Sequence, residues 1–138
     1  MATFPFELVS PERLVYSGTV TEVVVPGADG EFGILAGHAP FVSMLNPGVL
    51  TIKGDGAARK LFVRGGFAEA NPQGLTVLAE TAIPLADLPA DKLAQMIRDA
   101  QEDVEDAGDD VTRAGRQQFL EQLKSAAAAI EAEARSPH

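Results

Sequence analysis

The sequence of 138 residues contains no cysteine and only two histidines, one of which is the last residue. The lack of cysteine excludes a disulfide scaffold, a thiolate zinc site and thiol catalysis, and the scarcity of histidine excludes a histidine-rich metal site. Basic residues are also few: 11 Lys and Arg against 20 Asp and Glu give a net charge of −9. This balance argues against nucleic acid or anionic lipid as the main partner, because both bind clustered Lys and Arg.

Long apolar runs are missing as well. No stretch approaches the roughly 20 residues that a membrane span needs, and the first residues lack the basic and apolar regions of a signal peptide. We therefore expect a soluble, cytoplasmic protein.

Composition divides the chain near residue 86. Residues 1–86 contain 11 of the 13 glycines and 7 of the 9 prolines. The same part carries 8 acidic and 5 basic residues, net −3, whereas residues 87–138 carry 12 and 6, net −6. Because Gly and Pro punctuate short strands while Ala, Glu, Gln and Lys favour helices, we predict an α+β chain with domains at 1–86 and 87–138.

The first domain has the pattern of many short strands. Apolar and polar residues alternate from Phe4 to Leu8, and Pro5, which has no N–H to donate, places this strand at a sheet edge or marks its start. Turn clusters rich in Gly and Pro recur about every 8–12 residues, which predicts an antiparallel β-sandwich or flattened barrel. Further strands are expected at residues 13–16, 19–25, 31–35, 41–45, 49–53, 59–64, 67–70 and 75–80.

Residues 87–138 are predicted to form an antiparallel helical hairpin. Asp87 is the expected N-cap of the first helix, Gly108 the residue after its end, and Asp109 or Asp110 the next N-cap. Apolar residues recur at steps of three and four in both helices, in stripes that are narrow and rich in alanine, so the hairpin should be marginal unless it docks. The stripes are Leu93, Met96, Ile97, Ala100, Val104 and Ala107, and then Leu120, Leu123, Ala127, Ile130 and Ala134.

Residue chemistry alone indicates no catalytic residue and no metal site. Gly27, Gly30 and Gly33 lack the lysine and the following helix of a phosphate-binding loop, so we interpret them as turn glycines. His38 has no Ser, Cys or Asp partner in a recognisable motif. One helix face carries four carboxylates without the spacing of a calcium loop and is interpreted as solvated. These carboxylates belong to Asp99, Glu102, Asp103 and Asp106.

Five segments carry a family resemblance. The longest, residues 25–40, reads VPGADGEFGILAGHAP, and the others lie at 9–18, 45–49, 63–69 and 76–82. In this order and spacing they resemble the hallmark motifs of the ε subunit of bacterial rotary ATP synthases. The resemblance covers residues 4–86 almost continuously, and beyond residue 86 only the helix–turn–helix architecture is similar.

The resemblance implies a noncatalytic rotor subunit at the foot of the central stalk, which couples rotation of the c-ring to the catalytic head through the γ subunit. It implies a peripheral location on the cytoplasmic face of the bacterial inner membrane, with membrane association only through the complex. The c-ring contacts that it implies are Gly27, Asp29, Gly30, Glu31 and Phe32, and the γ contacts are Ser10, His38, Ala39 and Pro40.

The resemblance also implies that the hairpin regulates ATP hydrolysis by reaching the catalytic β and α subunits through Arg113, Arg116 and Lys124. Residues 111–138 carry four basic and three acidic side chains, so we expect weak inhibition. Some relatives bind ATP through a hydrophobe-Asp-x-x-Arg-Ala motif in the first helix. Residues 88–94 lack its arginine, so we expect no cofactor, and ATP binding stays the less favoured alternative.

Two other classes of function stay open on the sequence. A free-standing β-sandwich adaptor or binding module would have the same composition, but it would elute alone, whereas an ε subunit would copurify with γ and the ring. An enzyme that uses the acidic helix face as a metal site is the third interpretation. Calorimetric titration with Mg²⁺ or Ca²⁺ distinguishes it from the other two.

Overall fold

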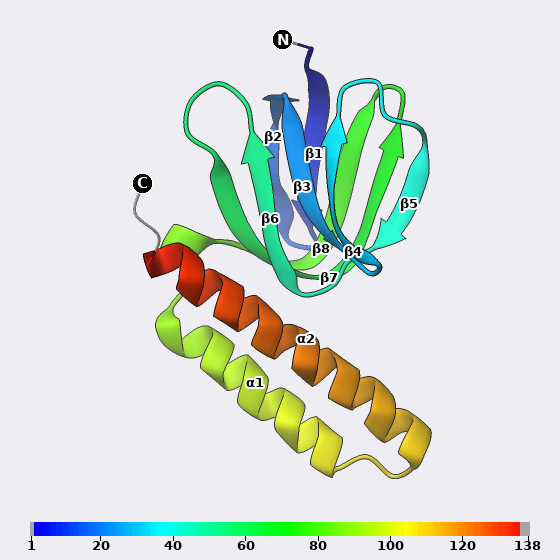
Figure 1. The fold of residues 1–138 in the computed structure, drawn as a ribbon, viewed down its shortest axis with the longest axis vertical. Coiled ribbons are helices and arrows are strands. Elements are labelled where there is room, and N and C mark those ends of the chain that lie inside the picture. The colour runs from blue at the N-terminus through cyan, green and yellow to red at the C-terminus, as the bar shows by residue number, and fades with distance from the viewer. Residues whose placement is uncertain (1, 136–138) are drawn as a thin grey trace. The chain divides into compact units, whose positions relative to one another are not determined.

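The computed structural model describes residues 2–135, which divide into two compact units between Leu85 and Ala86 (Figure 1). The first unit is a β-sandwich and the second a pair of helices, which confirms the predicted α+β fold. The sheet stays open instead of closing into a barrel. The strands are β1 (Phe4–Ser10), β2 (Arg13–Val20), β3 (Glu22–Gly27), β4 (Gly30–Leu35), β5 (Phe41–Met44), β6 (Gly48–Lys53), β7 (Arg59–Asn71) and β8 (Gly74–Pro84).

The strands are ordered β2-β1-β8-β7-β6-β3-β4, and β5 also pairs with β7. All pairs are antiparallel except β1 and β8, which run parallel with Leu8 beside Val77. The wholly antiparallel sandwich of the prediction is therefore wrong at this pair. β1 has a neighbouring strand on each side, so it does not lie at a sheet edge. Of the two positions predicted from Pro5, an edge strand or the start of a strand, the structure has the second. Pro5 precedes the first pair with β8, at Phe6, where its missing N–H is not needed.

β7 is one long strand where the sequence pattern predicted two. Gly65 and Gly66, which lie between the strands predicted at 59–64 and 67–70, are inside it with φ of 72° and 97°. Residues before them pair with β6 and residues after them with β5, while β8 pairs along both halves. Only glycine fits at Gly66, since an added Cβ would collide with the carbonyl group of Leu78. The glycine pair therefore redirects the strand without ending it.

A third correction concerns the strand predicted at residues 19–25. It is interrupted at Thr21, whose N–H and hydroxyl both donate to the carbonyl oxygen of Lys53, at 2.8 and 3.0 Å. These bonds hold the chain at the junction where β2 ends and β3 begins. The sequence pattern does not reveal this junction, because the β-branched residues of 19–25 favour a strand on both sides of it.

The core lies between the sheet layers and takes alternate residues from each strand. In β1, Phe4, Phe6 and Leu8 are buried while Pro5 and Glu7 are exposed, as the alternating pattern predicts. Each fully buried large apolar side chain contributes about 1.5–3 kcal/mol. The side chains of this core that are at most 1% exposed are Phe6, Leu8, Val20, Val23, Val25, Leu50, Val63, Ala68, Val77 and Ala79.

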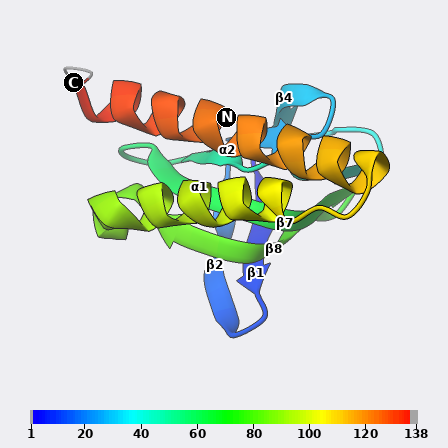
Figure 2. The same cartoon turned by 90° about the horizontal axis from the view of Figure 1, so that it is seen from below.

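The second unit contains α1 (Ala90–Glu105) and α2 (Asp110–Arg135), which run antiparallel beside each other (Figure 2). The predicted cap at Asp87 is wrong: Asp87 ends a short 3₁₀ helix, Leu85–Asp87, and Pro89 is the N-cap of α1. A proline disfavours helical geometry in the residue before it, so α1 cannot extend back through Leu88.

The turn between the helices differs in part from the prediction. α1 ends at Glu105, and the N–H of its C-cap residue, Asp106, donates to the carbonyl oxygen of Glu102. Gly108 does not adopt the left-handed conformation expected of it. Asp109 is the N-cap of α2, as predicted, and its carboxylate accepts the N–H of Thr112 at 2.7 Å.

The apolar stripe of α1 is confirmed, since Leu93, Ala100 and Ala107 are buried and the stripe's other members are half-buried. In α2, the buried alanine is Ala126, and the predicted Ala127 beside it is half-buried. The other buried stripe positions of α2 are Leu120 and Leu123, Ile130 is half-buried, and the side chain of Ala134 lies outside the described residues.

Candidate functional site

The β3–β4 hairpin has an exposed acidic tip. Gly27 pairs with Gly30 across the turn residues Ala28 and Asp29, and Gly30, which follows the turn, has a φ of 122°, a backbone conformation that favours glycine. Asp29, Gly30 and Glu31 are all exposed at this turn. The tip therefore carries two carboxylates and little else that a partner could contact.

The other two predicted c-ring residues lie beneath the tip. Gly27 is buried, and a side chain there would collide with the ring of Phe32. Phe32 is half-buried and packs edge-on against Phe41, with ring centroids 5.3 Å apart. These two residues support the exposed turn from the core side.

A row of apolar side chains crosses the outer face of five neighbouring strands. Residues paired across a sheet point to the same face, and here each strand contributes one apolar residue to a continuous line. Met44 is 60% exposed, Leu14 54% and Leu78 38%. Aligned exposed apolar residues mark interaction sites, unlike scattered ones. We call the following residues the apolar row: Met44, Phe67, Leu78, Val9 and Leu14.

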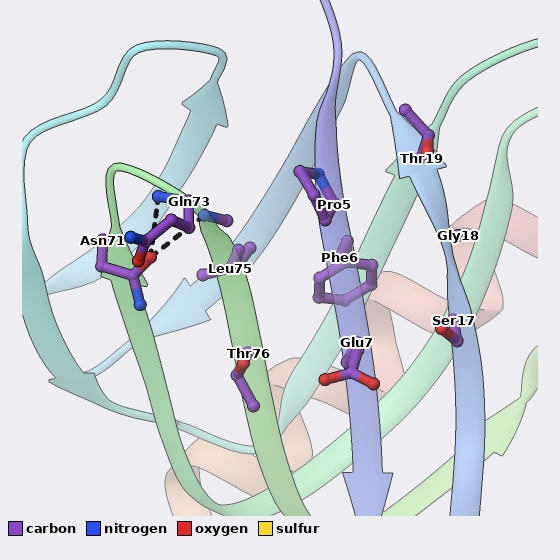
Figure 3. A pocket seen from close by; sticks show the side chains of 11 residues that line it. Pro5, Phe6, Glu7, Ser17, Gly18, Thr19, Asn71, Gln73, Leu75 and Thr76 are labelled. Carbon is purple, nitrogen blue, oxygen red and sulfur yellow. Dashed lines mark hydrogen bonds between the residues drawn. The ribbon is translucent and has the colours of Figure 1, made fainter.

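A groove of about 430 Å³ lies next to this row, across β2, β1 and β8 (Figure 3). Glu7 stands between Ser17 and Thr76 and is the one charged residue among those that line the groove. At one end, the side-chain oxygen of Asn71 accepts the N–H groups of Gln73 and Gly74, at 2.9 and 3.1 Å. The turn that bounds the groove is therefore held in shape by Asn71.

The residues predicted to contact γ are placed at the two ends of β1. Ser10 ends the strand, and its hydroxyl donates to the carbonyl oxygen of Arg13 at 3.4 Å. His38 packs against Phe4, which begins the strand, with Ala39 and Pro40 exposed beside it. Six strand steps of about 3.3 Å separate the two ends by about 20 Å. Of these residues, Ser10 adjoins the apolar row and His38 does not.

Two of the three predicted regulatory side chains are engaged within the helical hairpin. Arg113 donates to Asp110 at 2.9 Å and to the carbonyl oxygen of Ala107 at 3.2 Å. Arg116 donates to the carbonyl oxygen of Asp103 at 2.7 Å, near the end of α1. Lys124 is exposed. The two arginines therefore stabilise the turn between the helices.

Residues 2–135 contain no group of three or more His, Asp or Glu side chains arranged to hold a metal ion. On the acidic face of α1, the carboxylate of Asp99 accepts a hydrogen bond from Gln95 at 2.8 Å. Neither helix of the described chain is long and apolar enough to cross a membrane.

Sequence reasoning missed the apolar row because its members lie far apart in the chain and are aligned only by the sheet register. A local signal was present. Apolar pairs such as Leu8-Val9 and Val77-Leu78 break the alternation of a strand with one buried face. Such pairs indicate that both faces of the strand carry apolar side chains.

Comparison with known proteins agrees with this architecture. Residues 3–85 match the family described as ATP synthase, Delta/Epsilon chain, beta-sandwich domain. The ATP synthase epsilon chain of Parvibaculum lavamentivorans is 53% identical over 86% of this chain and 91% of its own length. That of Mesorhizobium japonicum is 47% identical over 92% and 95%.

Solved structures show the same fold. A chain in the cryo-EM structure of Euglena gracilis mitochondrial ATP synthase with OSCP, F1 and the c-ring is 25% identical with a TM-score of 0.70, covering 91% of this chain and 82% of that chain. A chain from the central stalk and c-ring of the Tetrahymena thermophila mitochondrial enzyme has a TM-score of 0.68 at 12% identity, over 91% and 97%.

A β-sandwich followed by a helical hairpin, with its candidate contacts on exposed surfaces, defines a noncatalytic subunit of the delta/epsilon class. With curated relatives about half identical over most of its length, the chain belongs to the ATP synthase epsilon chain family. The family predicted from the motifs is thereby confirmed, and with it the prediction of a noncatalytic subunit.

Proposed function

We propose that this chain transmits rotation from the c-ring to the γ subunit of an ATP synthase, with the apolar row against γ and the β3–β4 tip against the ring. The apolar row is the observation that carries the proposal. Three members of this row are exposed and the other two, Val9 and Phe67, are half-buried, so the row is costly in water and is stabilised when a partner covers it. Membership of the epsilon chain family supports a partner from the central stalk.

The acidic tip suits the second contact. Asp29 and Glu31 are exposed at a turn narrow enough to enter a crevice between ring subunits. Charges at the rim of an interface set the register and the rate of approach, so polar or basic loops of the ring are the fitting surface. The subunit is then peripheral at the cytoplasmic face of the bacterial inner membrane, and it reaches the membrane only through the complex.

The helical hairpin is the regulatory arm in this proposal, with β and α as its partners, and we expect it to inhibit ATP hydrolysis weakly. Arg113 and Arg116 already bond within the hairpin, so binding to acidic residues of β would have to break these bonds. Of the three predicted regulatory cations, this leaves the exposed Lys124 for β. The proposal includes no bound cofactor.

Deletion of residues 87–138 from the assembled enzyme tests the weak regulation. The ATPase rate should change little, because the hairpin contributes little inhibition. A several-fold rise in rate would show a strong inhibitor. ATP added to the full-length chain in a calorimeter should give no binding heat.

The γ contact is tested by Leu14→Asp in the apolar row, with the binding of the full-length chain to purified γ as the measurement. We expect at least a tenfold loss of affinity, because the charge would be buried against the partner. Val111→Asp is the matched control, since Val111 is 85% exposed and lies in α2, outside the row. Equal binding by Leu14→Asp and the unmodified chain would reject the proposal, and elution without γ would favour the free-standing adaptor.

A further inference from the structure

A second row, beside the apolar row, carries two carboxylates. It consists of the next outward-facing residue on each of the same strands, so the sheet register fixes its members as firmly as those of the apolar row. Glu69 on β7 and Glu7 on β1 flank Thr76 on β8. We call the following residues the acidic row: Val42, Glu69, Thr76, Glu7 and Ser17.

The two carboxylates have a defined spacing. Glu7 and Glu69 are two strands apart, so their Cα atoms are separated by about 10 Å. Both side chains are exposed, and neither has an ion-pair or hydrogen-bond partner within the part of the chain that the structure describes. Glu7 also stands in the groove, where the hydroxyl groups of Ser17 and Thr76 lie on either side of it (Figure 3).

A partner that covers the apolar row also changes the surroundings of these two carboxylates. Glu7 is two residues from Val9 along β1, and Glu69 is two residues from Phe67 along β7, a distance of about 7 Å in each case. A partner that covers Val9 and Phe67 therefore also removes water from both carboxylates. An ionised group that loses water without gaining a counter-charge is strongly destabilising, so the partner has to supply cations.

We propose that the acidic row receives two cationic side chains, Lys or Arg about 10 Å apart, from the γ subunit that covers the apolar row, and that these pairs set its register. The inference rests on the proposed function. If γ were shifted along the strands by the spacing between the two rows, its cations would lie on apolar residues and its apolar residues on Glu7 and Glu69. Both mismatches are unfavourable, so the two rows together select one alignment.

The test compares Glu7→Gln, Glu69→Gln and the double variant for binding of the full-length chain to purified γ at low and at physiological salt. Each single change should weaken binding about 5- to 10-fold at low salt, with a smaller effect at higher salt, because the pairs are electrostatic. The double variant should have the weakest salt dependence. Asp55→Asn removes the same charge from the β6–β7 connection, outside both rows, and should leave the affinity unchanged.

Glutamine keeps the shape of glutamate on an exposed face, and a urea unfolding curve for each variant shows that the fold is retained. Unchanged affinity and salt dependence in all three variants would overturn the inference. If Leu14→Asp still lost binding in that case, the proposed γ contact would stand without the acidic row. If Leu14→Asp also bound normally, both would fail.

Discussion

The ring of His38 meets the ring of Phe4 edge to face, with centroids 5.4 Å apart and planes inclined by 75°. The two imidazole nitrogens of His38 face the carbonyl oxygens of Leu35 at 2.8 Å and Gly74 at 3.3 Å. One side chain thus ties the β4–β5 connection to the start of β1 and to the β7–β8 turn. A residue predicted to contact γ also holds the sandwich together.

Replacing His38 by Ala should destabilise the sandwich by about 1–2 kcal/mol, because an aromatic contact and a hydrogen bond are lost together. Urea unfolding of the full-length chain measures this. A double-mutant cycle with Phe4→Leu isolates the ring contact, for which we expect a coupling of about 0.5–1 kcal/mol. A coupling of zero would mean that the rings are neighbours without a specific interaction.

Gly66→Ala should destabilise the sandwich by about 3 kcal/mol or more, since the new Cβ meets the carbonyl group of Leu78 and φ is already 97°. Gly56→Ala is the matched control. Its φ is 90°, but nothing lies within 4 Å of an added Cβ, so only the backbone strain of about 1 kcal/mol is expected. Equal losses in thermal unfolding would contradict the close approach of β7 and β8 at this point.

Acidification should loosen the start of α2. The N–H and the hydroxyl of Thr112 donate to the carboxylate of Asp109 and lower its pKa below the ordinary value. A lowered folded-state pKa gives stability that is present above the unfolded-state pKa, near 4, and lost as the pH falls through the folded value. The protection factor of the Thr112 amide, which is its exchange rate measured by NMR relative to the intrinsic rate at the same pH, should therefore fall below about pH 4.

The control for this pH dependence is Asp109→Asn. Asparagine keeps an oxygen that can accept the N–H of Thr112 but cannot ionise in this range, so the cap is retained without its pH dependence. If the unmodified chain and the variant responded identically to acid, other carboxylates of the hairpin would be responsible.

Arg116→Ala should loosen the turn between the helices, because the bond from Arg116 to the carbonyl oxygen of Asp103 is lost. We expect a loss of about 0.5–1 kcal/mol, since the side chain is exposed and solvent screens it. Lys124→Ala removes an equal charge from an exposed site on the same helix and should have little effect. Faster amide exchange at residues 106–109 in the first variant alone would confirm the role of Arg116.

The sequence predicts the elements whose signals are local. The alternation from Phe4 to Leu8 defines β1, the apolar stripe defines α1, and Asp109 is recognisable as a cap because its chemistry acts within one turn. The fold class and the family follow from such signals and from motifs that are contiguous in the chain.

What the sequence does not predict depends on pairing between distant segments. The parallel partner of β1 and the continuity of β7 through Gly65 and Gly66 are decided by which strands meet, and a glycine pair alone resembles a turn. The apolar row is a property of five strands in register, so no single segment contains it. The cap at Pro89 was missed because a proline also fits the first turn of a helix.

The parallel pairing of β1 with β8 also bears on how the chain matures. β1 is synthesised well before β8, which is one of its two neighbouring strands. The apolar side chains of Phe4, Phe6 and Leu8 therefore stay exposed to water until β8 has been synthesised. Pairing across so many residues slows folding and prolongs the exposure of apolar side chains. A chain cut short before Gly74 should be bound by chaperones or aggregate, since it lacks the strand that completes the sandwich.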